Sequence, residues 1–182
     1  MPRALRLSLL FGLLVFTAGT ALAADCAGTH QIDRCLVGKW TMTTNGMEQW
    51  MRTHIRNFHV TSVSQSNNTI TLNADGSFAT GASNVTVHGA SARGMTGTGQ
   101  MAAQANGTWS AADGKFNICA QSSAMNGTAT VTGNGHSTTT PLHPALPPVS
   151  SRAYSCSGNT FTVTTQLHGD NVQSVYTKTP AP

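Results

Sequence analysis

The chain has 182 residues, of which only 9% are charged and 6% are aromatic, with ten Lys and Arg against six Asp and Glu. The basic residues are dispersed rather than clustered, so nucleic acid is not an expected partner. An abundance of Thr, Ser, Asn, Gly and Ala is typical of exported β-proteins and unfavourable for long helices.

The first 23 residues have the organisation of a secretory signal peptide. Arg3 and Arg6 precede an apolar run over residues 7–16, which is followed by Ala21-Leu22-Ala23. This run is shorter than the roughly 20 apolar residues of a membrane span, and no later segment is apolar enough to serve as one. We therefore expect residues 24–182 to form one domain, periplasmic or secreted, with eight basic residues against six acids and a formal charge of +2.

Four cysteines remain after this leader, and an even number in an exported chain predicts disulfides. Three connectivities are possible, and their spacing does not match a zinc site. We favour one short loop closed by Cys26 and Cys35, and a second bridge between Cys119 and Cys156, because the latter two lie in strand-like segments.

A first strand over residues 38–43 is followed by the only convincing helix of the mature chain. Asn45 is a candidate N-cap with Glu48 three residues later, as in a capping box. The apolar residues that follow recur at helical spacing and predict one buried face. They are Met47, Trp50, Met51, Ile55 and Phe58.

The remainder alternates between strand patterns and turn residues. Asp75-Gly76 and Asp113-Gly114 predict tight hairpins, while residues 89–107 are rich in glycine and fit either strands or a loop. Prolines predict an extended surface loop over residues 141–149. About eight to ten short strands favour an antiparallel barrel or sandwich. The expected strand segments are 58–64, 69–72, 77–80, 85–88, 107–110, 115–120, 124–132, 152–156, 161–165 and 172–177.

Several short motifs resemble a known family. Gly38-Lys39-Trp40, the hairpins with Asp-Gly turns and the closing run from Tyr154 through Phe161 to Tyr176-Thr177-Lys178 resemble the lipocalin-like, or calycin, barrels of exported bacterial proteins. The resemblance implies that the Gly-x-Trp strand opens the barrel and that a basic residue of the last strand, Lys178, covers Trp40. It also implies binding of small apolar molecules. The chain departs from typical lipocalins in its glycine-rich middle and in the helix after the first strand.

His54 is the most notable polar residue on the apolar helix face. Beside Met47, Trp50 and Met51 it is a candidate contact for a ligand or a soft metal such as copper, because imidazole and thioether groups suit that ion. Helical spacing alone also explains the pattern, with the methionines filling a core. That simpler interpretation is favoured, so no metal or cofactor is assigned.

The sequence contains no pattern that indicates an enzyme. It lacks a Gly-x-Ser-x-Gly elbow and a His-Glu-x-x-His helix, and Asp75, Asp113 and Glu48 are explained by turns and a helix cap. The remaining acids are too few for a paired-carboxylate hydrolase. We expect a protein without catalytic activity.

The leading hypothesis is a lipocalin-like binding protein for a small apolar ligand, held in a barrel beneath the helix. One alternative is a periplasmic structural or protein-interaction module, and another is a copper-handling protein. The expected interior is formed by Trp40, Trp50, Phe78, Trp109, Phe116, Phe161 and Tyr176. The candidate ligand-binding residues are Trp40, Met47, Trp50, Met51, His54 and Trp109.

Overall fold

The computed structural model describes residues 31–54, 58–91, 93–143 and 149–180. The expected signal peptide and Cys26 lie outside these described residues. Within them, one sheet of eleven antiparallel strands is accompanied by a single helix, α2 (Gly46–His54). The strands are β1 (Gly38–Asn45), β2 (Phe58–Ser66), β3 (Thr69–Leu72), β4 (Ser77–Thr80), β5 (Ser83–Ser91), β6 (Thr96–Ala112), β7 (Lys115–Gly133), β8 (His136–Leu142), β9 (Val149–Ser157), β10 (Thr160–Leu167) and β11 (Asp170–Lys178).

Eight of these strands close into a barrel. The ring runs β1, β3, β4, β6, β7, β9, β10, β11 and back to β1, and every neighbouring pair is antiparallel. The predicted mainly β fold, with an antiparallel barrel and one helix after the first strand, is therefore confirmed. Closure leaves no unpaired strand edge around the ring, which is one way in which β-proteins avoid edge-to-edge association.

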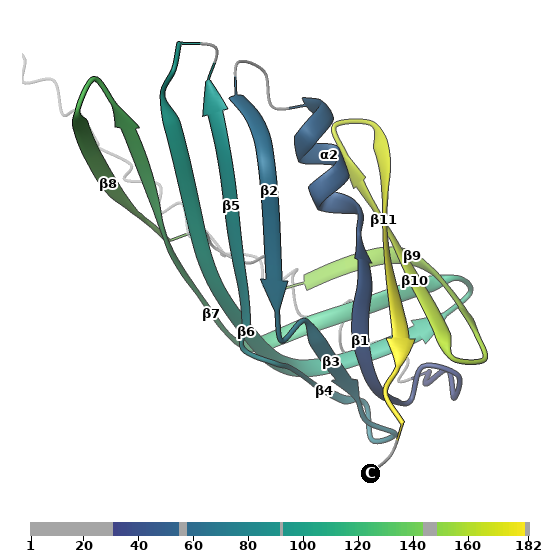
Figure 1. The fold of residues 1–182 in the computed structure, drawn as a ribbon. Coiled ribbons are helices and arrows are strands. Elements are labelled where there is room, and N and C mark those ends of the chain that lie inside the picture. The colour runs from purple at the N-terminus through teal and green to yellow at the C-terminus, as the bar shows by residue number, and fades with distance from the viewer. Residues whose placement is uncertain (1–30, 55–57, 92, 144–148, 181–182) are drawn as a thin grey trace, which may run out of the picture.

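Two strands continue beyond the barrel and form a second part of the sheet, which we call the extension. The first half of β6 pairs with β5, and the second half of β7 pairs with β8, while β2 is added outside β5. Figure 1 shows these long strands rising away from the ring. Most of the glycine-rich middle of the chain is thus in strands, with residues 89–91 at the end of β5 and residues 96–107 in β6.

The change of direction occurs at a bulge next to Gly107. The β6–β7 register shifts between Asn106 and Gly107. A Cβ atom at Gly107 would lie 2.0 Å from the carbonyl oxygen of Cys119, so only glycine fits this close approach.

The two faces of the extension differ in chemistry. In the β6–β7 ladder, Ala103 is opposite Met125 and Met101 is opposite Gly127, on the face that continues the barrel interior. The opposite face is rich in hydroxyl groups, as in the cross-strand contact between Thr130 Oγ1 and Thr139 Oγ1 at 2.9 Å. The apolar inner surface therefore extends beyond the closed ring.

The predicted Asp113-Gly114 turn and a further turn at Asn134-Gly135 have the backbone conformation of tight hairpins. Asp113 and Gly114 have φ angles of 51° and 72°, and Asn134 and Gly135 have φ angles of 51° and 76°. Consecutive positive φ angles match the right-handed twist of the flanking strands. By contrast, Pro141 was expected in a loop but lies in β8, opposite Thr128. Because β8 is an edge strand, it tolerates the missing N–H of a proline.

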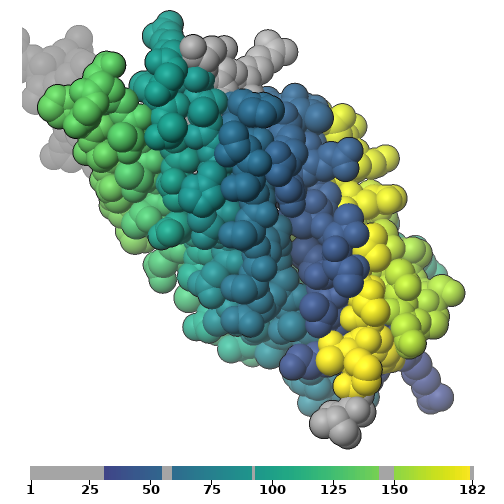
Figure 2. All heavy atoms as spheres, in the orientation of Figure 1, coloured from purple at the N-terminus to yellow at the C-terminus, as the bar shows by residue number. Residues whose placement is uncertain are grey.

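Helix α2 bridges the barrel and the extension. Its N-terminus is capped as predicted, since Met47 N donates to Asn45 Oδ1 at 2.9 Å, whereas Glu48 pairs with Arg52 at 2.9 Å. Arg52 Nη1 also donates to the carbonyl oxygen of Val60 in β2 at 2.7 Å. Figure 2 shows the helix and β2 between yellow β11 and the teal strands of the extension. Helix α2 is described up to His54, Ile55 of the predicted stripe lies outside the described residues, and Phe58 is the first residue of β2 and not part of the helix.

One end of the barrel is closed by the segment that precedes β1. Leu36 and Trp40 are fully buried there, and Trp40 Nε1 donates to the carbonyl oxygen of Leu36 at 2.6 Å. Lys178 lies over Trp40, with Nζ 5.2 Å from the ring centroid, as the resemblance implied. Tyr154 Oη donates to Asp33 Oδ2 at 2.9 Å and fixes the same segment.

The disulfide framework differs from the favoured pairing. Cys35 is bonded to Cys156, which links the closing segment to β9, so both favoured bridges are wrong. Cys119 is also disulfide-bonded. Short sequence spacing favoured a local bridge from Cys35, but the barrel brings Cys156, 121 residues away, to within 6.1 Å between Cα atoms.

Candidate functional site

The interior of the barrel next to the closed end is filled by aromatic side chains. Phe161 contacts Trp40 and Phe116, with ring centroids 5.6 Å and 5.3 Å apart, and Trp109 lies 6.2 Å from Phe116. The exposed fractions of Trp40, Trp109 and Phe116 are 3% or less. This cluster is a solid floor with the packing expected of a small barrel.

Above this floor is a cavity of about 210 Å³, which we call the mouth pocket. The walls of this pocket come from the next inward-facing residue of each strand. In β1 this residue is Met42, two residues after Trp40, and in β3 it is Ile70, two residues before Leu72. The wall is largely apolar, as a site for a small organic molecule requires. The lining residues are Met42, Asn68, Thr69, Ile70, Thr80, Gly81, Ser83, Ala103, Gln104, Ala105, Ile118, Met125, Arg152 and Tyr176.

Arg152 of β9 and Tyr176 of β11 bring a charged group and a phenol to the lining of the mouth pocket. In β9, Arg152 is opposite Phe116, and Tyr176 of β11 stacks on Phe161 with 5.3 Å between ring centroids. Burial raises the pKa of Tyr176, while the positive charge of Arg152 acts in the opposite direction. Within the described part of the chain, neither side chain has a hydrogen-bond partner or an ion pair.

Asn68 is fixed at the rim of the pocket by its neighbours. Its side-chain amide donates to Gln65 Oε1 and lies 3.9 Å from the sulfur of Met42. The backbone carbonyl oxygen of Asn68 accepts a hydrogen bond from Met42 N at 2.8 Å. The amide therefore has partners within the chain, in contrast to Arg152.

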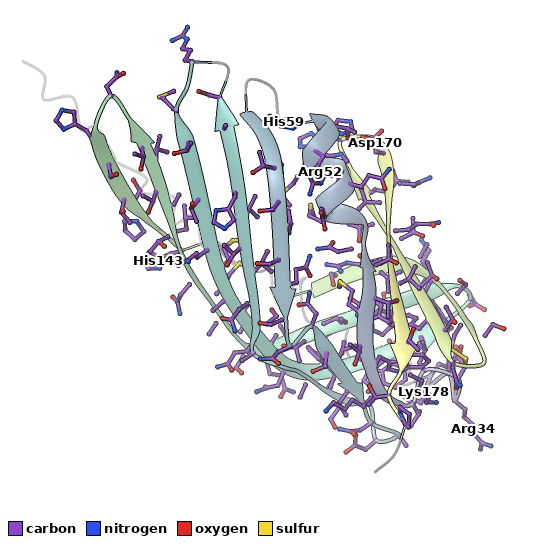
Figure 3. All side chains as sticks on the ribbon, viewed as in Figure 1. Arg34, Arg52, His59, His143, Asp170 and Lys178 are labelled. Carbon is purple, nitrogen blue, oxygen red and sulfur yellow. A yellow bond between two sulfur atoms is a disulfide. The ribbon has the colours of Figure 1, made fainter. Side chains whose placement is uncertain are left out.

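A second hollow, of about 450 Å³, lies between α2 and β11. Trp50 stacks there with the rings of His54 and His168, at centroid distances of 4.9 Å and 5.7 Å. Asp170 Oδ2 lies 2.8 Å from His54 Nε2, and accepts a hydrogen bond from Trp50 Nε1 at 3.1 Å. Figure 3 shows Asp170 next to the helix. These contacts tie the helix to the β10–β11 turn.

The structure divides the six candidate ligand-binding residues between two places. Trp40 and Trp109 are in the solid floor, 0% and 2% exposed. Trp50 and His54 form the stack outside the barrel, while Met47 is exposed and Met51 is half-buried on the same helix. Their role in ligand binding stays a prediction.

The copper hypothesis depends on His54, and both of its ring nitrogens have protein partners. Nδ1 lies 2.8 Å from Thr53 Oγ1 and 3.1 Å from the carbonyl oxygen of Trp50, while Nε2 faces Asp170. Across the described residues, no group of three or more His, Cys, Asp or Glu side chains is arranged to hold a metal ion.

Sequence reasoning did not single out Met125, Ile70 or Arg152 as site residues. The alternation of residues in β1 could have indicated Met42 as a pocket residue, because Met42 is on the same face of the strand as Trp40. For the others, the strand pattern gives the face but not which strands face each other across the barrel.

The chain matches no known family model, no curated protein and no solved structure.

Proposed function

We propose that this protein is an exported, lipocalin-like binding protein that holds a small apolar ligand in the mouth pocket. The observation that supports this most directly is an apolar cavity of about 210 Å³ above a solid aromatic floor in a closed barrel. The walls contain methionine, isoleucine and alanine side chains, so a bound alkyl or aromatic group gains about 0.8 kcal/mol per buried methylene. The proposal includes no catalytic step.

Two features support a location in the periplasm or outside the cell. A disulfide such as Cys35–Cys156 indicates an oxidising compartment. The leader over residues 1–23 has the charge and apolar pattern of an export signal. The described part of the chain contains no helix with the length and apolar character that crossing a membrane requires.

Neighbouring alanines in β6 provide a matched test of the pocket. Ala103 lines the mouth pocket, whereas Ala102 is on the opposite face and exposed. We expect Ala103→Phe to fill the cavity and to weaken binding of an apolar fluorescent probe by about tenfold or more, since it replaces ligand volume with protein. Ala102→Phe should bind the probe as the unchanged protein does. Equal binding by all three proteins would place the probe elsewhere and contradict the proposal.

A protein-interaction role is a second candidate, favoured by one feature of the extension. Strand β8 is the last strand of the sheet, and its outer edge has no strand partner among the described residues. An open edge of this kind accepts an added strand from another chain. A Thr138→Lys variant would then lose a partner that co-purifies from the export compartment, without a change in probe binding.

A further inference from the structure

Arg152 gives the mouth pocket a chemical preference that apolar walls alone do not have. It lines the cavity with Met42, Ile70, Ala105 and Met125. A guanidinium group carries five N–H donors and stays charged at any physiological pH. Such a group among apolar side chains is normally found with an acceptor, because an unpaired, partly desolvated charge is unfavourable.

No acceptor for this charge is found among the residues that the structure describes. Across the described residues, the ion pairs join Arg52 to Glu48 and His54 to Asp170, and neither involves Arg152. The side chain of Arg152 also takes part in no hydrogen bond with the described residues. The described acids Asp33, Glu48, Asp75, Asp113 and Asp170 are all absent from the pocket lining. The pocket thus contains one uncompensated positive charge.

Tyr176 adds a hydroxyl donor to the same part of the cavity. It lines the pocket with Arg152, and the two are close enough for the charge of Arg152 to influence the phenol. No atom of the described chain accepts a hydrogen bond from its hydroxyl group. A guanidinium and a phenol that face one cavity form a pair of donors for a single anionic group.

The surface that leads away from Arg152 is apolar. Ala103 and Met125 form opposite walls where β6 and β7 leave the ring, and Met101 is the next inward residue of β6. An elongated apolar tail that starts at Arg152 would therefore stay in contact with apolar side chains past the rim of the barrel.

Resting on the proposed function, we propose that the ligand is an alkyl carboxylate, with its head group on Arg152 and Tyr176 and its tail along Met125 and Met101. A single cation matches a single negative charge, so a carboxylate fits better than a phosphate monoester, which carries nearly two charges near pH 7. The carboxylate accepts two parallel N–H bonds from the guanidinium and one O–H bond from the phenol. The head group lies deep in the barrel and the end of the tail lies towards the extension.

The test compares decanoate with decanol, which has the same chain length and no charge, by calorimetric titration near neutral pH. We expect the unchanged protein to bind decanoate on the order of tenfold more tightly than decanol, since a hydrogen-bonded charge contributes more than a neutral group. Arg152→Met should reduce decanoate affinity by on the order of tenfold to hundredfold and leave decanol affinity nearly unchanged. Tyr176→Phe should have a smaller effect in the same direction.

Arg34→Met is the matched control, because Arg34 is exposed at the closed end of the barrel, near Lys178 (Figure 3). It should bind decanoate as the unchanged protein does. Equal affinity of the unchanged protein for decanoate and decanol would overturn the head-group assignment, but it would leave the proposed function intact. This comparison needs no variant. Decanoate binding that is unaffected in a folded Arg152→Met protein would also overturn it. If neither compound binds, the proposed function and the head-group assignment are both wrong.

Discussion

Trp50 and Asp170 connect the helix to the last hairpin of the barrel: the indole Nε1 donates to the Asp170 carboxylate at 3.1 Å. The same carboxylate oxygen lies 2.8 Å from His54 Nε2. One exposed acid on the β10–β11 side therefore holds two residues of α2. Because α2 has no fully buried residue, these polar contacts carry much of its attachment at this end.

Replacing Asp170 by Ala should loosen the helix. We expect the free energy of local opening of α2 to fall by about 1 kcal/mol, the usual net contribution of a hydrogen bond. Native-state amide exchange over residues 50–54 measures this opening. Asp170→Asn keeps an acceptor for Trp50 but has no charge. Its free energy of helix opening should lie between those of the unchanged protein and Asp170→Ala. Unchanged exchange in Asp170→Ala would show that the helix is held by other contacts.

Lys178→Met should destabilise the closed end of the barrel. The ammonium group lies over Trp40 and donates to the carbonyl oxygen of Cys35 at 3.4 Å. Loss of the cation–π contact and of this hydrogen bond should lower the free energy of unfolding by about 1–2 kcal/mol in denaturant titrations. Lys39→Met, on the exposed side of β1, should change it by less than about 0.5 kcal/mol. Equal losses in both variants would rule out a specific role for Lys178.

Stability should fall in strongly alkaline solution because of Tyr154. Burial, together with the hydrogen bond to Asp33, raises the pKa of its phenol from about 10 to about 12. The folded state therefore binds more protons than the unfolded state between these values, so the stabilising contribution is complete below about pH 10 and is lost as the pH rises to about 12. Denaturant titrations across this range measure the loss.

Tyr154→Phe is the informative variant for this pH dependence. It should be less stable near neutral pH, because Asp33 loses a donor, but its stability should fall less steeply between about pH 10 and pH 12. Burial also raises the pKa of Tyr176, so this second phenol contributes to the loss of stability in alkaline solution. Some dependence of stability on pH should therefore remain in Tyr154→Phe. An unchanged slope in Tyr154→Phe would mean that this phenol does not control the transition.

The Cys35–Cys156 bridge should be recovered directly by peptide mapping. Proteolysis of the oxidised protein should release one cross-linked pair that contains these two cysteines. The double variant Cys35→Ala with Cys156→Ala should be about 2–4 kcal/mol less stable, because the bridge closes a long loop. A cross-link between Cys35 and Cys26 in the mapping experiment would contradict the fold at the closed end.

Local chemistry made much of the strand pattern predictable. Asp113 and Gly114 adopt positive φ angles readily, so their residue types alone indicated this hairpin. Asn45 similarly marked the start of the helix, because its side chain accepts the N–H of Met47. Trp40 was expected in the interior, and it is fully buried.

Long-range pairing was not predictable from these signals. The pairing of Cys35 with Cys156 depends on how the barrel closes, and no local pattern encodes that closure. Aromatic residues such as Trp109 indicated an interior, but alternation does not distinguish the solid floor from the walls of a cavity. Arg152 was overlooked because a charged residue in a strand usually faces solvent, whereas this one lines the pocket.

Methionine methyl NMR tests the central claim that the ligand binds in the mouth pocket. Met42 and Met125 line that pocket, whereas Met47 is on the exposed side of α2 and Met95 is on an exposed turn. On titration with decanoate, the methyl signals of Met42 and Met125 should shift in a saturable way, while those of Met47 and Met95 should stay in place. Shifts confined to the helix methionines Met47 and Met51, or no saturable shift of any methionine, would contradict a ligand site in the barrel.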